Sequence, residues 1–211
     1  MDTRRNWWQQ MVKVKIYIEG GAPNDKLADI LFRKAWSTFF KAAGLQNNLP
    51  KCVPGYSRAN TFDSFVKSSP SKDEVVLLLI DSEIPIKEGN TVWQHLQNSG
   101  LNKPVNTGED RVYLMVQIME TWLLADIDAL EKYFGKGFKR NKIQAWPMLE
   151  EVSKESIVGA LSKATADCSR QYGKDTKGKI SFELLEKIDP RKVIEKCPQA
   201  KRLIDFLSPP R

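Results

Sequence analysis

The stretch V-K-V-K-I-Y-I-E-G-G, residues 12–21, decides the fold of this chain. Apolar residues occupy every second position from Val12 to Ile18, which is the period of a β-strand. Glu19 comes directly after this pattern, and the two glycines behind it allow a tight turn into a helical pattern. Open α/β sheets begin with this order of elements and bind ligands at the carboxyl ends of their strands. Glu19 is therefore the first candidate site residue, although it also suits an ordinary loop.

Six apolar residues in a row, V-V-L-L-L-I, predict a strand that ends in Asp81 and Glu83. Such a run is typical of a strand buried on both faces of a parallel sheet. The spacing of two puts both carboxylates on the same side of the extended chain. If this strand neighbours the one before Glu19, the three acids converge within roughly 5 to 10 Å. Carboxylates that close repel one another unless a cation joins them, so we expect a Mg²⁺ or Mn²⁺ site.

A long amphipathic helix is predicted to end before Gly44, because apolar residues from Leu27 to Phe40 recur every three or four positions. Asn24 is its expected N-cap. Asp25 lies in the first turn, where it either stabilises the helix dipole or supplies a further metal ligand.

A short strand near residues 51–54 and a brief helix around residues 61–67 are expected next. Ser57 and Arg58 lie in the loop between them, on the same rim as the acids if the strand is parallel. The guanidinium of Arg58 presents a planar fork of donors that suits a phosphate, and a solvated loop arginine is the alternative. Both residues are candidates for phosphate binding.

A third strand, R-V-Y-L-M-V-Q at residues 111–117, precedes Glu120. Glu120 falls just beyond the strand end and approaches the acidic cluster if this strand is also parallel. Asp126 is expected to cap the following helix, and His95 is expected to be packed in the fold rather than catalytic.

The last third of the chain is predicted to be helical, with prolines between helices at residues 157–166, 182–188, 191–196 and 200–207. Between the first two helices lies the basic loop R-Q-Y-G-K-D-T-K-G-K, residues 170–179. Its cations either bind the phosphates that an acidic metal site attacks or form a solvated surface. The candidate residues of this loop are Arg170, Lys174, Lys177 and Lys179.

The length of 211 residues, with 41% hydrophobic and 28% charged residues, predicts one globular folding unit. We expect a flexible extension at residues 1–10, an α/β core at 11–140 and a helical part at 141–211 packed on that core. No apolar run approaches the roughly 20 residues that span a bilayer, and the first residues do not resemble a signal peptide. A cytoplasmic protein without membrane contact is therefore expected.

The formal net charge of +7 favours a polyanionic partner such as DNA or RNA. The three cysteines are scattered without the spacing of a metal site or a disulfide framework, so free thiols are expected. The sequence contains no Walker A loop with which to bind ATP.

At these acids the sequence resembles the toprim domain, the metal-binding module of topoisomerases, bacterial primases and certain nucleases. That family has a Glu-Gly pair after its first strand and an Asp-x-Asp pair after a later strand. Glu19-Gly20 and Asp81-Ser82-Glu83 match, with Glu83 in place of the second aspartate. No tyrosine stands in a topoisomerase context and no primase zinc-binding segment is present, so strand passage and priming are not expected.

Nearly the whole chain resembles an uncharacterised prokaryotic family of toprim-like proteins, often encoded beside an ATPase in phage-defence neighbourhoods. The resemblance is carried, in order, by I-Y-I-E-G-G, L-L-I-D-S-E, M-V-Q-I-M-E-T-W-L-L-A-D and K-G-K-I-S-F-E-L-L-E-K-I-D-P. A lysine-glycine pair occurs in that family at the last of these segments. The resemblance therefore implies that Lys177 and Lys179 contribute to the site.

Together these features predict a Mg²⁺- or Mn²⁺-dependent nuclease that cleaves DNA or RNA and serves an anti-phage defence module under the control of a partner ATPase. Glu19, Asp81 and Glu83 would hold the metal, and the lysines and Arg58 would neutralise phosphate oxygens. A non-catalytic metal- or nucleic-acid-binding subunit and a small-molecule phosphatase are the alternatives. The sequence leaves the oligomeric state open.

Overall fold

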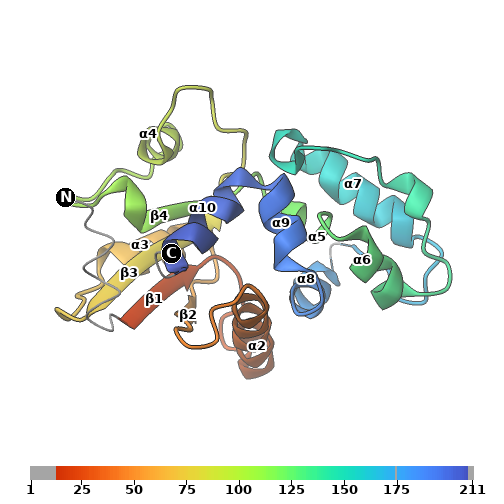
Figure 1. Ribbon diagram of the computed structural model, residues 1–211, viewed down its shortest axis with the longest axis horizontal. Coiled ribbons are helices and arrows are strands. Elements are labelled where there is room, and N and C mark those ends of the chain that lie inside the picture. The colour runs from red at the N-terminus through yellow and green to blue at the C-terminus, as the bar shows by residue number, and fades with distance from the viewer. Residues whose placement is uncertain (1–12, 174, 209–211) are drawn as a thin grey trace.

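A computed structural model of the protein describes residues 13–173 and 175–208 (Figure 1). Its sheet has four parallel strands in the order β2-β1-β3-β4, so the predicted α/β fold is confirmed. The strands are β1 (Lys13–Ile18), β2 (Lys51–Pro54), β3 (Glu74–Asp81) and β4 (Val112–Met115). All four carboxyl ends meet at one edge. The extension predicted at residues 1–10 lies outside the described residues.

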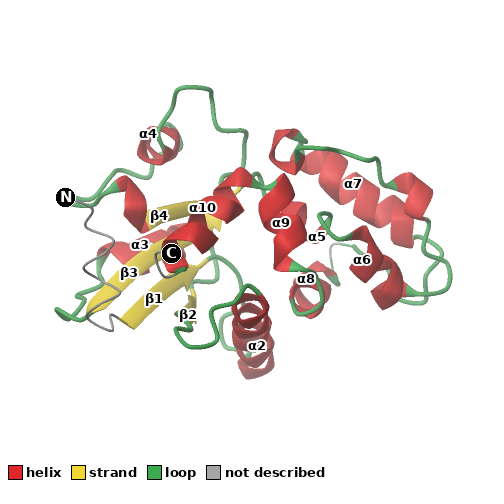
Figure 2. Ribbon diagram, viewed as in Figure 1, coloured by secondary structure: helices red, strands yellow, loops and turns green. Residues whose placement is uncertain are grey.

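Helices connect the strands and then form the rest of the molecule. Those between strands are α2 (Lys26–Ala42), α3 (Arg58–Val66) and α4 (Val92–Gln97). Those after β4 are α5 (Glu120–Leu123), α6 (Ile127–Phe134), α7 (Lys154–Thr165), α8 (Lys177–Leu185), α9 (Pro190–Lys196) and α10 (Pro198–Leu207). Three short 3₁₀ helices are η1 (Glu109–Arg111), η2 (Arg140–Lys142) and η3 (Leu149–Glu151). Figure 2 shows the strands at one end of the molecule and α6 and α7 at the other.

The central strand β3 separates two hydrophobic clusters. Leu77 and Leu79 belong to the cluster that includes α2 and the C-terminal helices, whereas Leu78 and Ile80 face Trp93 and its neighbours from α3 and α4. Because both faces of β3 are buried, its sequence is an unbroken run of apolar residues. Helices on both faces fix β3 in position and hence the acids at its carboxyl end.

Helix α2 begins one residue later than the sequence predicts. Asp25, rather than Asn24, is the N-cap, because its Oδ1 accepts hydrogen bonds from the amides of Leu27 and Ala28 at 2.9 and 3.0 Å. The expected apolar face is also shorter, since Leu27 and Ile30 are 63% and 60% exposed. The buried side of the helix comes from its later turns.

The C-terminal helices share the core of the sheet. Phe182 of α8 packs edge-on against Phe32 of α2, with 5.4 Å between ring centroids. On α10, Phe206 lies 5.6 Å from Tyr113 of β4, and Arg202 donates hydrogen bonds to the backbone oxygens of η1 and β4. One hydrophobic cluster therefore runs from β1 to α10.

Helix α8 starts five residues earlier than predicted. Backbone hydrogen bonds fix this start, because the Lys177 amide donates to the Gly173 carbonyl at 2.8 Å and the Ile180 amide donates to the Thr176 carbonyl at 3.0 Å. Lys177 and Lys179, expected in a loop, therefore lie in the first turn of a helix. The basic loop is correspondingly shorter.

Two smaller expectations are confirmed. His95 is 4% exposed, and its Nε2 lies 3.0 Å from the Ser82 carbonyl oxygen. The three cysteines are free and buried.

Among residues 13–173 and 175–208, no helix has both the length and the apolar character needed to cross a membrane.

Candidate metal centre

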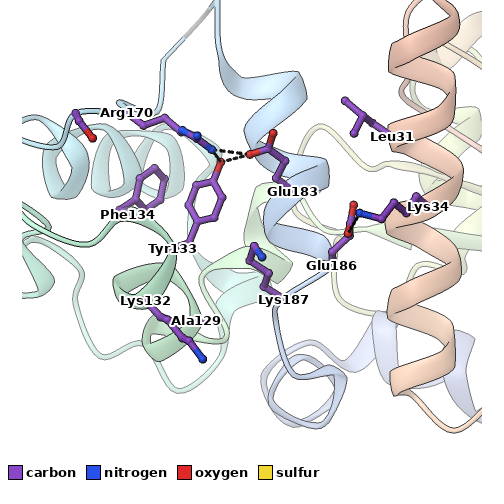
Figure 3. A pocket seen from close by; sticks show the side chains of 11 residues that line it. Leu31, Lys34, Ala129, Lys132, Tyr133, Phe134, Arg170, Glu183, Glu186 and Lys187 are labelled. Carbon is purple, nitrogen blue, oxygen red and sulfur yellow. Dashed lines mark hydrogen bonds and ion pairs between the residues drawn. The ribbon is translucent and has the colours of Figure 1, made fainter.

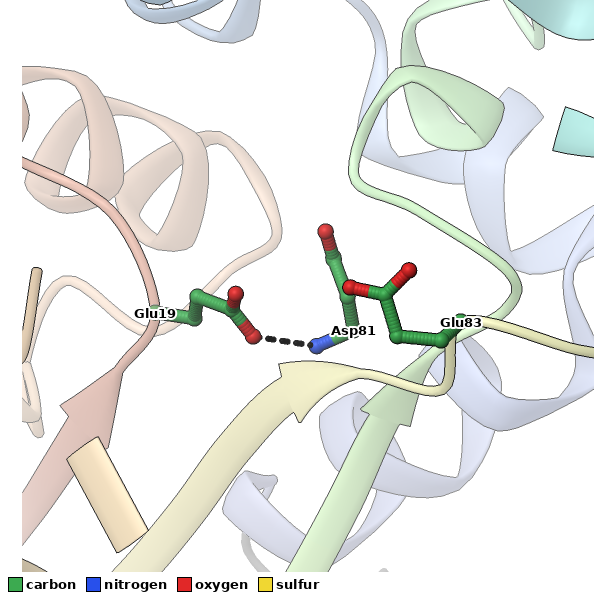
Figure 4. A group of neighbouring side chains, drawn as sticks. All are labelled: Glu19, Asp81 and Glu83. Atoms are coloured by element: carbon green, nitrogen blue, oxygen red, sulfur yellow. Dashed lines mark hydrogen bonds between the residues drawn. The ribbon is translucent and has the colours of Figure 1, made fainter. Parts of the chain in front are cut away.

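Three carboxylates meet where β1 and β3 end (Figure 4). Glu19 follows β1, Asp81 is the last residue of β3, and Glu83 lies two residues beyond. One carboxylate oxygen of each lies within 4.8 Å of the others. The two strands are hydrogen-bonded neighbours, so their ends bring these side chains together as the sequence predicts. We call Glu19, Asp81 and Glu83 the acidic edge.

The carboxylates of Glu19 and Asp81 differ in their hydrogen bonds. Oε2 of Glu19 accepts a hydrogen bond of 3.1 Å from the Asp81 amide. Oδ1 of Asp81 is buried and has no hydrogen-bond partner among the described residues. A buried carboxylate oxygen without a partner carries a large desolvation cost, so it is suited to a ligand from outside the chain.

The electrostatics of the acidic edge favour a cation. Burial raises the pKa of Asp81 well above its usual value, and the charges of Glu19, Glu120 and Glu83 raise it further against one opposing backbone hydrogen bond from Met119. Burial also raises the pKa of Glu19, which the Asp81 amide partly offsets. Without a cation the two acids therefore hold their protons to a higher pH than free carboxyl groups do, and a bound cation would favour proton release.

Glu83 is the most accessible member, with 42% of its side chain exposed. Its φ is +67°, a left-handed conformation that is uncommon for a side chain other than glycine. Oε2 of Glu83 lies 2.9 Å from Nζ of Lys154, and this hydrogen bond raises the lysine's pKa. Lys154 was not predicted from the sequence, because it reaches Glu83 only through the packing of α7.

The position of Lys154 is itself supported by a buried side chain. Gln117 accepts a hydrogen bond of 3.3 Å from the Lys154 amide and donates one of 3.1 Å to the Val152 carbonyl. Gln117 follows β4, so a residue of the same sheet edge holds the start of α7 beside Glu83. No local sequence motif predicts this contact.

Glu120 lies in α5 and is 6% exposed. Its Oε1 accepts a hydrogen bond of 2.6 Å from the Tyr172 hydroxyl, which lies 2.8 Å from Ser181 of α8. Its charge raises the pKa of Asp81, so it lies near the acidic edge without belonging to the group of three. Burial and the neighbouring Glu120 raise the pKa of Tyr172, which therefore remains a donor. Tyr172 was not singled out from the sequence.

Two of the predicted phosphate-binding cations approach the acidic edge. Arg58, the first residue of α3, and Lys177, the first residue of α8, each lower the pKa of Glu19. The Nη2 of Arg58 donates to Ser99 at 2.9 Å, and its buried Nε has no partner among the described residues. Positive charge thus faces the acidic edge from two helix starts.

The remaining candidates lie elsewhere or have other partners. Asp25 caps α2, and Ser57 caps α3 by accepting from the Asn60 amide at 3.3 Å. Arg170 and Lys179 lie beside Glu183 of α8, at 2.8 and 3.9 Å. Lys174 lies outside the described residues.

Asp126 is the N-cap of α6, as predicted, because its Oδ1 accepts from the Ala129 amide at 3.3 Å. It also forms an ion pair of 2.6 Å with Lys192 of α9. These contacts give Asp126 a structural role in joining two helices.

The sequence pattern of one protein family, the domain of unknown function DUF4276, matches residues 19–208. The chain belongs to this family. The match begins at Glu19 and includes every residue of the acidic edge. No curated protein and no solved structure matched the chain.

Proposed function

We propose that this DUF4276 protein is a metal-dependent nuclease that hydrolyses phosphodiester bonds of DNA or RNA at the acidic edge. One observation carries the proposal. The unpartnered, buried Oδ1 of Asp81 lies in a cluster whose three carboxylates approach within 4.8 Å at the carboxyl ends of parallel strands. Such an arrangement suits a hard divalent cation with oxygen ligands.

Glu19, Asp81 and Glu83 would hold Mg²⁺ or Mn²⁺. The bound ion supplies a Lewis acid that polarises a phosphoryl oxygen and lowers the pKa of a nearby water. Glu83 is exposed enough to move when it binds, since its current partner is the side chain of Lys154. The two deeper acids are fixed by β1 and β3 and need little rearrangement.

The surrounding cations would bind the substrate. Arg58 and Lys177 act on Glu19 from two helix starts, and Lys154 lies against Glu83. Positive groups in these places neutralise phosphate oxygens as negative charge shifts during bond cleavage. The chain's net charge of +7 favours a polyanionic substrate over a small neutral one.

The arrangement also supports a toprim-like relation. A glutamate-glycine pair follows the first strand, and an acidic pair follows its parallel neighbour β3. As a further part of the proposal, a partner ATPase controls the nuclease in an anti-phage defence module, since the sequence has no ATP-binding loop of its own.

The decisive experiment is cleavage of plasmid DNA, single-stranded DNA and transfer RNA with Mg²⁺ or Mn²⁺. Wild type and Glu88→Gln, a change of an exposed glutamate in the loop after β3, should cleave the same substrate. Glu19→Gln should lose at least about 100-fold in rate, because a metal ligand is removed. Equal cleavage by Glu19→Gln would refute the metal site.

If the isolated wild type is inactive, calorimetry with Mg²⁺ and Mn²⁺ tests the same residues without turnover. Binding by wild type that is lost in Asp81→Asn would support the centre, and the cleavage assay would then be repeated with the ATPase. Absence of binding in wild type would contradict the proposal.

A non-catalytic metal- or nucleic-acid-binding subunit is the second candidate. It is favoured by the ion pair between Glu83 and Lys154, which occupies one of the three carboxylates. Metal binding without cleavage, with or without a partner ATPase, would select this alternative.

A further inference from the structure

A pocket of about 800 Å³ lies between α2, α6 and α8 (Figure 3). Leu31 and Lys34 of α2 form one side, and Lys132 and Tyr133 of α6 form the other. Figure 3 shows Glu183 and Glu186 on the helix between them, with Arg170 at the rim. None of the residues of the acidic edge lines this pocket.

Four cations line the pocket, and only two of them are neutralised. Lys34 pairs with Glu186 at 2.7 Å, and Arg170 pairs with Glu183 at 2.8 Å. Lys132 and Lys187 form no ion pair with any described residue. Two unpaired ammonium groups at one pocket leave an excess of positive charge, which favours an anionic ligand.

The pocket also offers a stacking surface. The Arg170 guanidinium lies over the Tyr133 ring, 5.4 Å from its centroid, and the Tyr133 hydroxyl donates to Glu183. Guanidinium planes and aromatic rings stack on nucleobases. Leu31 adds apolar surface on the opposite side. The lining therefore suits a base as well as a phosphate.

Helix α8 connects the pocket to the acidic edge. Phe182 of α8 lies against Gly20, the residue after Glu19, whereas Glu183 and the following Glu186 and Lys187 line the pocket. The nine residues of α8 span about 13 Å, and Lys187 lies two residues beyond the end of the helix. At about 3.4 Å per phosphate of a stacked strand, the length of α8 corresponds to about four phosphates.

We propose that the pocket binds the single-stranded continuation of the nucleic acid whose scissile phosphate lies at the acidic edge. The inference rests on the proposed function and adds a second contact region to it. Lys177 and Lys179 lie outside the pocket at the start of α8, and these further cations favour a polymer over a free nucleotide, which would use only the pocket. The volume suits one unpaired strand, since pockets of this size enclose small ligands rather than a duplex.

The test measures binding without divalent cations, so that it does not depend on cleavage. A labelled single-stranded oligonucleotide of about ten nucleotides, longer than α8, is titrated by fluorescence anisotropy at several salt concentrations. The variant is Lys132→Ala with Lys187→Ala. The matched control, Lys72→Ala with Lys103→Ala, removes the same charge from two exposed lysines that do not line the pocket.

The pocket variant should bind about tenfold more weakly, and its salt slope should fall by about 1.4, the value for two lost phosphate contacts on a single strand. The control should change affinity less than about twofold. Equal weakening by both variants, or no weakening by either, would overturn the proposal. So would a free nucleoside triphosphate that binds wild type as tightly as the oligonucleotide and is lost in the pocket variant.

This result is separable from the proposed function. If wild type binds neither Mg²⁺ nor Mn²⁺ but the pocket variant alone loses oligonucleotide binding, the strand-binding pocket stands and the nuclease proposal fails. If cleavage depends on Glu19 but the pocket variant binds normally, the nuclease stands and the pocket proposal fails.

Discussion

At the acidic edge three carboxylates lie within 4.8 Å, and one of their oxygens is buried without a partner. In the pocket between α2, α6 and α8, two of the four lining cations pair with Glu183 and Glu186. The first site is fixed by adjacent strands, and only Glu83 of its three acids forms an ion pair, whereas in the second site half of the cations pair with glutamates and are themselves exposed. Uncompensated buried charge demands one specific ligand, whereas partly compensated exposed charge binds in a graded, salt-dependent way.

Asp81→Asn tests whether the acidic edge requires a bound cation, and it should have the largest effect. Loss of a ligand should weaken Mg²⁺ affinity at least about 100-fold, while the metal-free protein keeps or gains thermal stability because a repelling buried carboxylate is removed. Calorimetry and thermal unfolding without metal measure the two effects. A large loss of stability without metal would mean that Asp81 is a structural acid.

Glu150 shows what burial does to a carboxylate outside the metal centre. Burial raises its pKa to about 7, although it accepts a hydrogen bond of 2.9 Å from the Gln199 amide. Because the folded pKa lies above the ordinary 4.5, the native state binds more protons between these values. The free energy of unfolding should therefore fall by about 3 kcal/mol as pH rises from about 4.5 to about 7.

Glu150→Gln should flatten that pH dependence while keeping an acceptor for the Gln199 amide. Urea unfolding of both proteins at pH 5 and pH 8 provides the measurement. Identical pH dependence would show that Glu150 ionises freely in the folded protein, and the contrast between buried and exposed charge would lose this support.

Lys154→Met tests the contact between the helical part and the acidic edge. Removing the ammonium releases Glu83, so Mg²⁺ affinity should rise by up to about fivefold, the range expected for a half-exposed ion pair. The cleavage rate should nevertheless fall if Lys154 also binds the substrate phosphate. Unchanged affinity would show that the ion pair does not compete with the metal.

Glu183→Gln tests how far a glutamate neutralises the cations of the pocket between α2, α6 and α8, and it should have the smallest effect. Glu183 holds Arg170 and lies 3.9 Å from Lys179, so neutralising it frees two cations. Oligonucleotide affinity should rise about threefold, with a steeper dependence on salt. The fluorescence titration described above provides the readout, and weaker binding would instead indicate that Glu183 positions Arg170.

The sequence predicted the acidic edge because strand ends are local features. The alternation before Glu19 and the apolar run before Asp81 both identify parallel strands, whose carboxyl ends meet by geometry. Lys154 and Tyr172 were not predicted, since each reaches the site through the packing of helices on one another. Asp25 shows a third case, in which the sequence allowed either stabilisation of the helix dipole or a metal ligand, and the structure places it as the N-cap that was expected at Asn24.

The basic loop shows why helix starts are harder to predict than strand ends. Lys177 and Lys179 precede the apolar residues of α8, so periodicity places the start of the helix too late. The turn closed by Gly173 and Thr176 sets the true start. The pocket depends on which sides of α2, α6 and α8 face one another, and no single segment carries that information.

Helix α10, which Figure 1 shows across β4, has a consequence for the timing of synthesis. Its Arg202 binds the backbone of β4, and its Phe206 packs on Tyr113 of the same strand. At 5 to 20 residues per second, roughly 6 to 25 seconds separate the synthesis of Glu83 from that of Leu207. A nascent chain thus carries its three acids well before the helix that packs on β4 exists, so β4 gains this cover only after Leu207 has been made.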